Sequence, residues 1–307
     1  MVPRAEFRSY YGRPVLQRPT WKAHNVAGYF FLGGLAAGSS LLAAGGDLTG
    51  RPTLRRVGRL TASAALGGSL AALIADLGRP DRFYNMLRVF RPTSPMNMGS
   101  WILAAYGPLA TVAAVTEAVT GPARNGRTAR RIALIGRVAG LGAAAVAPGL
   151  ASYTAVILGD TAVPTWHDAH RELPFVFVGS AASAAGGLAM ALTPQGELAP
   201  ARLLAAVGSA LELAAGRRLE QRLGTVGEPL RAGRAGGLLR LARALTGAGA
   251  LVGGTLGGRS RPAAIGGGLA MLSGSACTRF GLFYAGVAGS QDPRFTVLPQ
   301  RERLEGS

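Results

Sequence analysis

Residues 76–101 read DLGRPDRFYNMLRVFRPTSPMNMGSW and join two strongly apolar runs, residues 57–75 and 99–120. Each run can cross a bilayer as a helix, because about 20 residues at a rise of 1.5 Å span the hydrocarbon. The joining segment gathers arginines, acids, amides and aromatics. A carboxylate that ends one span, followed by a polar, proline-broken entry to the next, indicates a chemical site at a membrane surface. The segment therefore predicts a membrane protein with a polar site near one face.

The composition of the whole chain agrees with membrane insertion. Of its 307 residues 49% are hydrophobic and 16% are charged, although the formal net charge is +18. Basic residues in the loops of a multi-pass membrane protein reconcile these values. A nucleic-acid-binding protein would present an exposed basic face, whereas these arginines are scattered between apolar runs. We therefore expect a lipid bilayer and no nucleic acid as a partner.

Eight apolar runs are candidate transmembrane helices. They cover residues 25–44, 57–75, 99–120, 132–158, 173–192, 201–215, 238–257 and 263–288. We expect an all-α polytopic membrane protein with about eight transmembrane helices in two four-helix bundles. The expected organisation is a polar N-terminal segment (1–24), a transmembrane domain (25–288) and a polar C-terminal tail (289–307). Pro148 is expected to kink the fourth run next to Ser152 and Tyr153, and glycines such as those in residues 33–38 to allow close helix packing.

The ends of the chain and the basic loops predict its orientation. Residues 1–22 are polar and arginine-rich, without an apolar core before a cleavage site, so the first span is expected to stay as an anchor. The loops on the side of the two termini contain more Lys and Arg in total than the loops on the opposite side, which favours both termini in the cytoplasm. We expect a multi-pass protein of a bacterial cell membrane.

The start of the first span is one candidate site. His24, Asn25 and Tyr29 lie within about a turn and a half of each other. Imidazole and phenol groups both donate and accept hydrogen bonds, so this group could bind a quinone carbonyl and relay its proton. The alternative is an Asn that caps the helix and an interfacial aromatic.

Asp76 and Tyr153 are the other candidates for a quinone-binding or proton-relay site. Asp76 ends the second span and is expected either to form an interfacial ion pair with Arg79 or Arg82, which would fix the loop, or to act as a proton acceptor beside a redox-active ligand. Tyr153 is a phenol deep in the fourth span, where its hydroxyl needs a partner.

Two charged residues within the later spans, Glu212 and Arg279, are expected either to pair with buried polar groups or to line a transport path.

Several prosthetic groups do not fit the chain. The only histidines are His24, His167 and His170, and none lies in the middle of a span, so a haem with paired axial histidines is not expected. The single cysteine, Cys277, cannot hold an iron–sulfur cluster or a disulfide within the chain. We expect no metal site and no catalytic residue, so the chain could handle protons and a quinone without an electron carrier of its own.

The sequence resembles the NrfD/PsrC family, the membrane subunits of polysulphide reductase-like oxidoreductases. The resemblance covers nearly the whole chain and is strongest in the first five spans. The residues that carry it are 29–38 (YFFLGGLAAG), 76–83 (DLGRPDRF), Ser94-Pro95-Met96 with Gly99-Ser100-Trp101, Tyr153-Thr154, Pro164 with Trp166, Leu173-Pro174 and Arg279.

The resemblance implies an eight-helix subunit without haem that binds menaquinone or ubiquinone. It also implies two partners, a ferredoxin-like iron–sulfur subunit and a molybdopterin catalytic subunit. The iron–sulfur subunit would pass electrons between the quinone and the catalytic subunit. Tyr153 matches a tyrosine of the family's quinone site, and Asp76 and Arg79 match its signature loop. Tyr29 falls near the family's histidine position, with His24 and Asn25 upstream.

We therefore expect the quinone-binding anchor subunit of a respiratory oxidoreductase complex, not catalytic alone. Arg82, Asn97 and Trp101, in the loop of residues 76–101, are expected to face the partner subunit. A transporter with Asp76, Glu212 and Arg279 along its path is an alternative, although no inverted repeat is evident. A passive membrane anchor is a third hypothesis.

Overall fold

The computed structural model describes residues 16–120 and 126–298, so residues 1–15 of the predicted N-terminal segment and 299–307 of the predicted tail lie outside it. The described residues are largely helical and contain no strand, which confirms the predicted all-α class. Eight of their helices have 20 residues or more. These are α1 (Ala23–Leu48), α2 (Pro52–Asp76), α3 (Pro95–Thr120), α4 (Arg127–Gly159), α6 (Leu173–Leu192), α7 (Ala199–Arg222), α9 (Gly233–Thr255) and α10 (Arg261–Gln291).

Short helical segments connect the long helices. The loop between α2 and α3 contains η2 (Pro80–Leu87), and α5 (Pro164–His167) precedes α6. In the second half of the chain, η3 (Gln195–Glu197) precedes α7, and η4 (Gly224–Gly227) and α8 (Glu228–Arg231) connect α7 to α9.

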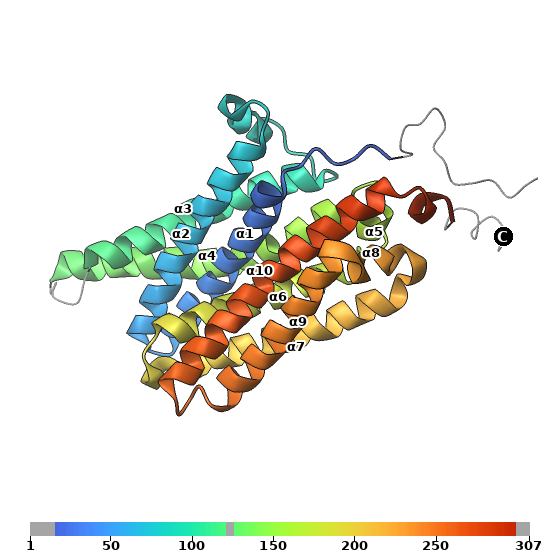
Figure 1. The fold of residues 1–307 in the computed structure, drawn as a ribbon. Coiled ribbons are helices and arrows are strands. Elements are labelled where there is room, and N and C mark those ends of the chain that lie inside the picture. Colours follow the sequence, from blue (N-terminus) through green and yellow to red (C-terminus); the bar gives the residue numbers. More distant parts are fainter. Residues whose placement is uncertain (1–15, 121–125, 299–307) are drawn as a thin grey trace, which may run out of the picture.

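The long helices form two groups of four, as predicted (Figure 1). In the first group α1 packs along α2 and α3 along α4, and in the second α6 packs along α7 and α9 along α10. Helices α1 and α4 contact α6, and α1 also contacts α10, so α1 and α6 lie at the junction of the groups. The functional candidates of the first four spans are thus held in one bundle.

Seven of the eight predicted apolar runs lie within a long helix, and α6 has the predicted bounds, whereas the run 238–257 extends two residues past the end of α9 at Thr255. Within residues 16–120 and 126–298, five helices are long and apolar enough to cross a membrane: α1, α2, α3, α4 and α6. Helices α7, α9 and α10 carry more charge or more glycine, and α7 continues to Arg222, beyond the predicted end at residue 215. The count of eight spans stays a prediction.

Small residues allow the close packing of these helices, as expected. A Cβ added at Gly38 would lie 2.7 Å from the Ala181 carbonyl oxygen and 2.6 Å from the Ala185 Cβ, so α1 and α6 meet almost backbone to backbone. Helix α4 continues through Pro148 as a single helix, and the Ser152 Oγ donates a hydrogen bond to the Pro148 carbonyl oxygen at 2.9 Å.

Candidate functional site

A cavity of ≈ 270 Å³ opens between the start of α1, the end of α2, the start of α3 and the second half of α4. Its walls are mainly apolar, with a few convergent polar groups, as in sites that bind small organic molecules. The polar lining residues are Thr20, Asn25, Tyr29, Asp76, Ser100 and Tyr153. Four predicted site residues, Asn25, Tyr29, Asp76 and Tyr153, are therefore brought together here.

Tyr29 and Tyr153 form a buried pair of phenols across the interface of α1 and α4. The Tyr29 hydroxyl donates a hydrogen bond to the Tyr153 hydroxyl oxygen at 2.6 Å, and the two residues are 5% and 6% exposed. Because Tyr153 accepts in this hydrogen bond, its own hydroxyl proton is not used within the pair. Tyr29 is thus the partner that the Tyr153 hydroxyl, deep in a span, requires. The sequence identified both residues as site candidates but did not reveal their contact.

Two packing contacts fix the positions of these rings. The Ser69 Oγ donates to the Tyr29 carbonyl oxygen at 3.1 Å, which ties α1 to α2 at this level. The backbone of Gly99 in α3 lies directly against the Tyr153 ring, where an added Cβ would collide with the ring carbons. The orientation of Tyr153 therefore depends on a glycine at position 99.

Asp76 closes the polar side of the cavity. Its Oδ1 accepts hydrogen bonds from the backbone N–H of Lys22 at 3.3 Å and from the Asn25 Nδ2 at 3.2 Å. The carboxylate thus lies at the N-terminus of α1, where the helix dipole favours a negative charge. Among the described residues no ion pair joins Asp76 to Arg79 or Arg82, so the expected pairing with an arginine is wrong. Both arginines are exposed instead.

His24 does not join this group. Its side chain is exposed and does not line the cavity, whereas the next residue, Asn25, is buried. Successive residues of a helix are rotated by about 100° around its axis. His24 and Tyr29, five residues apart, are therefore separated by about 140° and cannot share a face. The structure places His24 at the surface beside the site.

The loop that precedes α3 lines one side of the cavity through Met86, and Met96 in the first turn of α3 lines it too. Asn97 organises this loop, because its Nδ2 donates to the carbonyl oxygens of Met86 at 2.9 Å and Val89 at 2.8 Å. Its Oδ1 accepts from the Arg91 backbone N–H at 2.6 Å. The partner-facing role predicted for Asn97 stays a prediction.

The outer surface of the same loop carries aromatic and basic side chains. Phe83, Tyr84 and Phe90 are exposed, as is Arg82, and the Phe90 ring meets Trp101 edge to face at 5.8 Å. The loop that lines the cavity through Met86 thus has an outer face with both aromatic and basic side chains.

The chain matches a family model described as "Polysulphide reductase, NrfD" over residues 16–197, more than half of its length. The chain belongs to the NrfD family. This confirms the resemblance and assigns a polytopic membrane subunit of an oxidoreductase complex. The matched region of this NrfD protein contains every residue that lines the cavity. Comparison with curated proteins gives no match.

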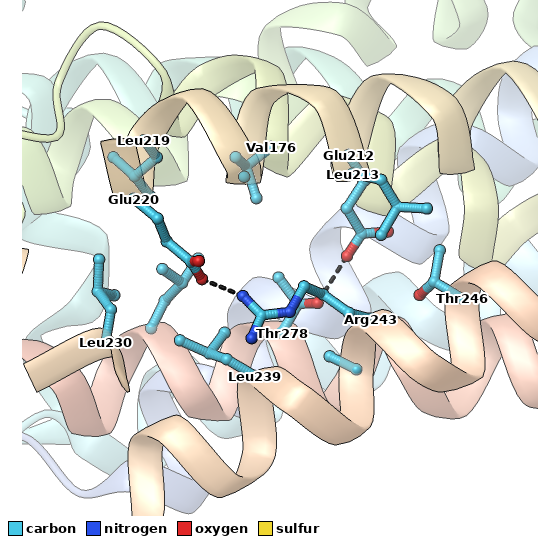
Figure 2. A pocket seen from close by; sticks show the side chains of 13 residues that line it. Val176, Glu212, Leu213, Leu219, Glu220, Leu230, Leu239, Arg243, Thr246 and Thr278 are labelled. Atoms are coloured by element: carbon cyan, nitrogen blue, oxygen red, sulfur yellow. Dashed lines mark hydrogen bonds and ion pairs between the residues drawn. The ribbon is translucent and has the colours of Figure 1, made fainter. Parts of the chain in front are cut away.

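The second bundle of this NrfD protein holds Glu212, which Figure 2 shows, and Arg279. Glu212 on α7 accepts a hydrogen bond from the Thr278 Oγ1 at 2.6 Å, beside a small cavity of ≈ 40 Å³. Arg279 on α10 donates to the Phe177 carbonyl oxygen at 2.7 Å and stacks on the Phe177 ring at 3.7 Å. Both residues therefore pair with buried groups across the bundle. This is the first of the two alternatives expected for them, the second being a transport path.

Proposed function

We propose that this chain binds the ring of a menaquinone or ubiquinone in the cavity of the first bundle. It would do so as the membrane subunit of a respiratory molybdopterin and iron–sulfur oxidoreductase complex in a bacterial cell membrane. The observation that carries the proposal is the Tyr29–Tyr153 hydrogen bond, in which Tyr153 accepts, so that its own proton can be donated to a ligand in the cavity that it lines.

The residues of the cavity fit a quinone. Apolar side chains such as Val26, Leu73 and Leu103 would contact the ring, and Tyr153 and Asp76 supply polar groups on different helices. The volume of ≈ 270 Å³ lies just below the range of about 300 to 1,000 Å³ that small-molecule sites occupy, which suits a single ring. A bound quinone would supply the electron chemistry.

The residues of the chain would then hold and move protons. Tyr153 would donate a hydrogen bond to a carbonyl oxygen of the ring, and Tyr29 would fix the Tyr153 hydroxyl in that direction. Asp76, whose Oδ1 is held by Lys22 and Asn25, would exchange a proton through its Oδ2 between the ring and the surface. The partner iron–sulfur subunit would dock over the loop that carries Arg82 and Trp101 and pass electrons to the molybdopterin subunit.

The test of the site is Tyr153→Phe in the purified complex, with quinol affinity and quinol-dependent reduction as readouts. Loss of one neutral hydrogen bond, about 1 to 1.5 kcal/mol, predicts about fivefold to tenfold weaker quinol binding. Tyr106→Phe is the matched control, because Tyr106 is a buried phenol that donates to the Ala36 carbonyl oxygen at 2.8 Å and does not line the cavity. Unchanged affinity and turnover in Tyr153→Phe would refute the assignment.

Copurification tests the partners separately. We expect an iron–sulfur protein to copurify with the full chain, and Arg82→Glu to weaken its retention without changing quinol affinity. Substrate uptake by the chain alone, with no bound iron–sulfur protein, would favour a transporter.

A further inference from the structure

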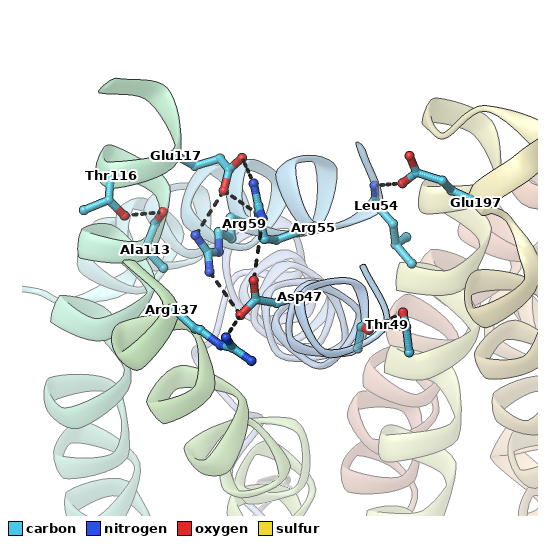
Figure 3. A network of polar contacts seen from close by, with 11 residues as sticks. Asp47, Thr49, Leu54, Arg55, Arg59, Ala113, Thr116, Glu117, Arg137 and Glu197 are labelled. Carbon is cyan, nitrogen blue, oxygen red and sulfur yellow. Dashed lines mark hydrogen bonds and ion pairs between the residues drawn. The ribbon is translucent and has the colours of Figure 1, made fainter. Parts of the chain in front are cut away.

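A second polar cluster lies at the end of the first bundle opposite the quinone cavity (Figure 3). It joins four helices through Asp47 at the end of α1, Arg55 and Arg59 near the start of α2, Glu117 near the end of α3 and Arg137 on α4. Glu117 accepts two hydrogen bonds from Arg55 and one from Arg59, each at 3.0 Å. In the sequence, Arg59 lies inside the second apolar run (57–75) and Arg55 lies just before it.

The charges of this cluster do not cancel. Three guanidinium groups face two carboxylates, which leaves one positive charge in excess. Asp47 lies 3.6 Å from Arg55, 4.0 Å from Arg59 and 3.2 Å from Arg137, so one carboxylate is shared among three cations. Arg137 reaches Asp47 through its Nε, and among the described residues no hydrogen bond engages its two terminal amino groups.

A cavity of ≈ 330 Å³ adjoins these groups, and its outer side faces the surroundings of the bundle. The Arg137 side chain is 53% exposed at its edge, and Leu134, which also lines the cavity, is 61% exposed. Large apolar residues on the adjoining surfaces of α3 and α4 are exposed as well, namely Val115, Val119, Ile135 and Val138. In a membrane protein such a surface contacts lipid chains.

The length of α4 places the cluster near the level of the lipid headgroups. Its 33 residues extend about 50 Å, which exceeds the hydrocarbon thickness by about 20 Å. Arg137 lies about 15 Å along the axis from the first residue, Arg127, so its flexible side chain can reach the boundary between chains and headgroups. Arg130 and Arg131 are exposed in the same end of the helix and add positive charge there.

We propose that this cavity binds the phosphodiester of an anionic glycerophospholipid, with an acyl chain along the apolar surface of α3 and α4. The terminal amino groups of Arg137 would donate to the phosphate oxygens, a geometry that guanidinium groups favour. The single excess positive charge matches the single negative charge of a phosphodiester. A zwitterionic lipid would bind less well, because its cationic headgroup would meet Arg127, Arg130 and Arg131.

The test is a lipid titration of the full-length, delipidated protein in neutral detergent, followed by native mass spectrometry. We expect phosphatidylglycerol to bind more tightly than phosphatidylcholine, and Arg137→Gln to weaken phosphatidylglycerol binding about fivefold, as expected for one arginine near a lipid headgroup. Arg217→Gln is the charge-matched control, because Arg217 is exposed on α7, which belongs to the second bundle.

Further arms make the test decisive. Asp47→Asn removes a carboxylate that competes for Arg137, so it should strengthen phosphatidylglycerol binding, which a damaged fold cannot mimic. Equal binding of the two lipids, or wild-type phosphatidylglycerol binding in both Arg137→Gln and Asp47→Asn, would overturn the proposal. Displacement of the lipid by millimolar inorganic phosphate would also overturn it, because the site would then recognise free phosphate.

Discussion

The contact between Gly99 and Tyr153 allows the geometry of the candidate site to be tested by one added methyl group. In Gly99→Ala the new Cβ would collide with the Tyr153 ring, which is 6% exposed and hydrogen-bonded to Tyr29. Overpacking of this kind costs about 1 to 3 kcal/mol of folding free energy. The relief available to the protein is rotation of the Tyr153 ring, which would break the 2.6 Å hydrogen bond from Tyr29.

Gly107→Ala on the same helix is the matched control. There an added Cβ would meet only the Leu66 Cδ2 at 3.7 Å, an ordinary contact. Because alanine is favoured over glycine in a helix by about 0.5 to 1 kcal/mol, this variant should be unchanged or slightly stabilised. The two substitutions are chemically identical, so the difference between them isolates the collision at Tyr153.

The assay is thermal unfolding of the purified protein in detergent, together with quinol binding. We expect Gly99→Ala to unfold at a lower temperature than Gly107→Ala and to bind quinol more weakly. In a Tyr153→Leu background the penalty of Gly99→Ala should shrink, because the colliding ring is absent. If Gly99→Ala matched Gly107→Ala in both stability and quinol binding, the position of Tyr153 against α3 would be refuted.

Two further predictions concern the carboxylates. Asp76→Asn keeps an oxygen that can accept from Lys22 and Asn25 but removes the proton acceptor, so quinol-dependent turnover should fall about a hundredfold or more while quinol affinity stays within about twofold. Equal loss of affinity and turnover would contradict a proton-relay role. At Glu172, burial raises the pKa, but hydrogen bonds at 2.8 and 2.5 Å and the charge of Arg222 outweigh it and hold the pKa below its usual value. The ionised Glu172 therefore stabilises the folded state fully above about pH 4.3, the usual pKa of glutamate. This stabilisation is lost as the pH falls through the lower pKa that Glu172 has in the folded state. Thermal unfolding against pH should show this loss in Arg218→Gln, whose side chain is 81% exposed, and not in Arg222→Gln. The same acid profile in both variants would contradict it.

The sequence contains enough information to locate the helices and the level of the site. The eight apolar runs mark all eight long helices, and the candidates Asp76 and Tyr153 lie with the start of α1 around one cavity. The buried face of each helix depends on packing that no single sequence displays. His24 and Asn25 are adjacent in the sequence, yet only Asn25 enters the cavity.

The partners of the charged groups were also beyond sequence reasoning. Asp76 accepts from the backbone of Lys22, a donor that any residue but proline provides, so no residue type in the loop could signal it. Asp47 and Glu117 lie at the ends of their apolar runs, where charged residues are ordinarily solvated. Only the arrangement of four helices shows that they share Arg55 and Arg59.

Photoaffinity labelling with an azido-quinone, mapped by mass spectrometry, tests the central claim most directly. A quinone ring in the cavity predicts labelled peptides from the start of α1, the end of α2 and the part of α4 around Tyr153, with labelling suppressed by excess unmodified quinol. Labelling confined to the second bundle, or labelling of the cavity that excess quinol leaves unchanged, would contradict it.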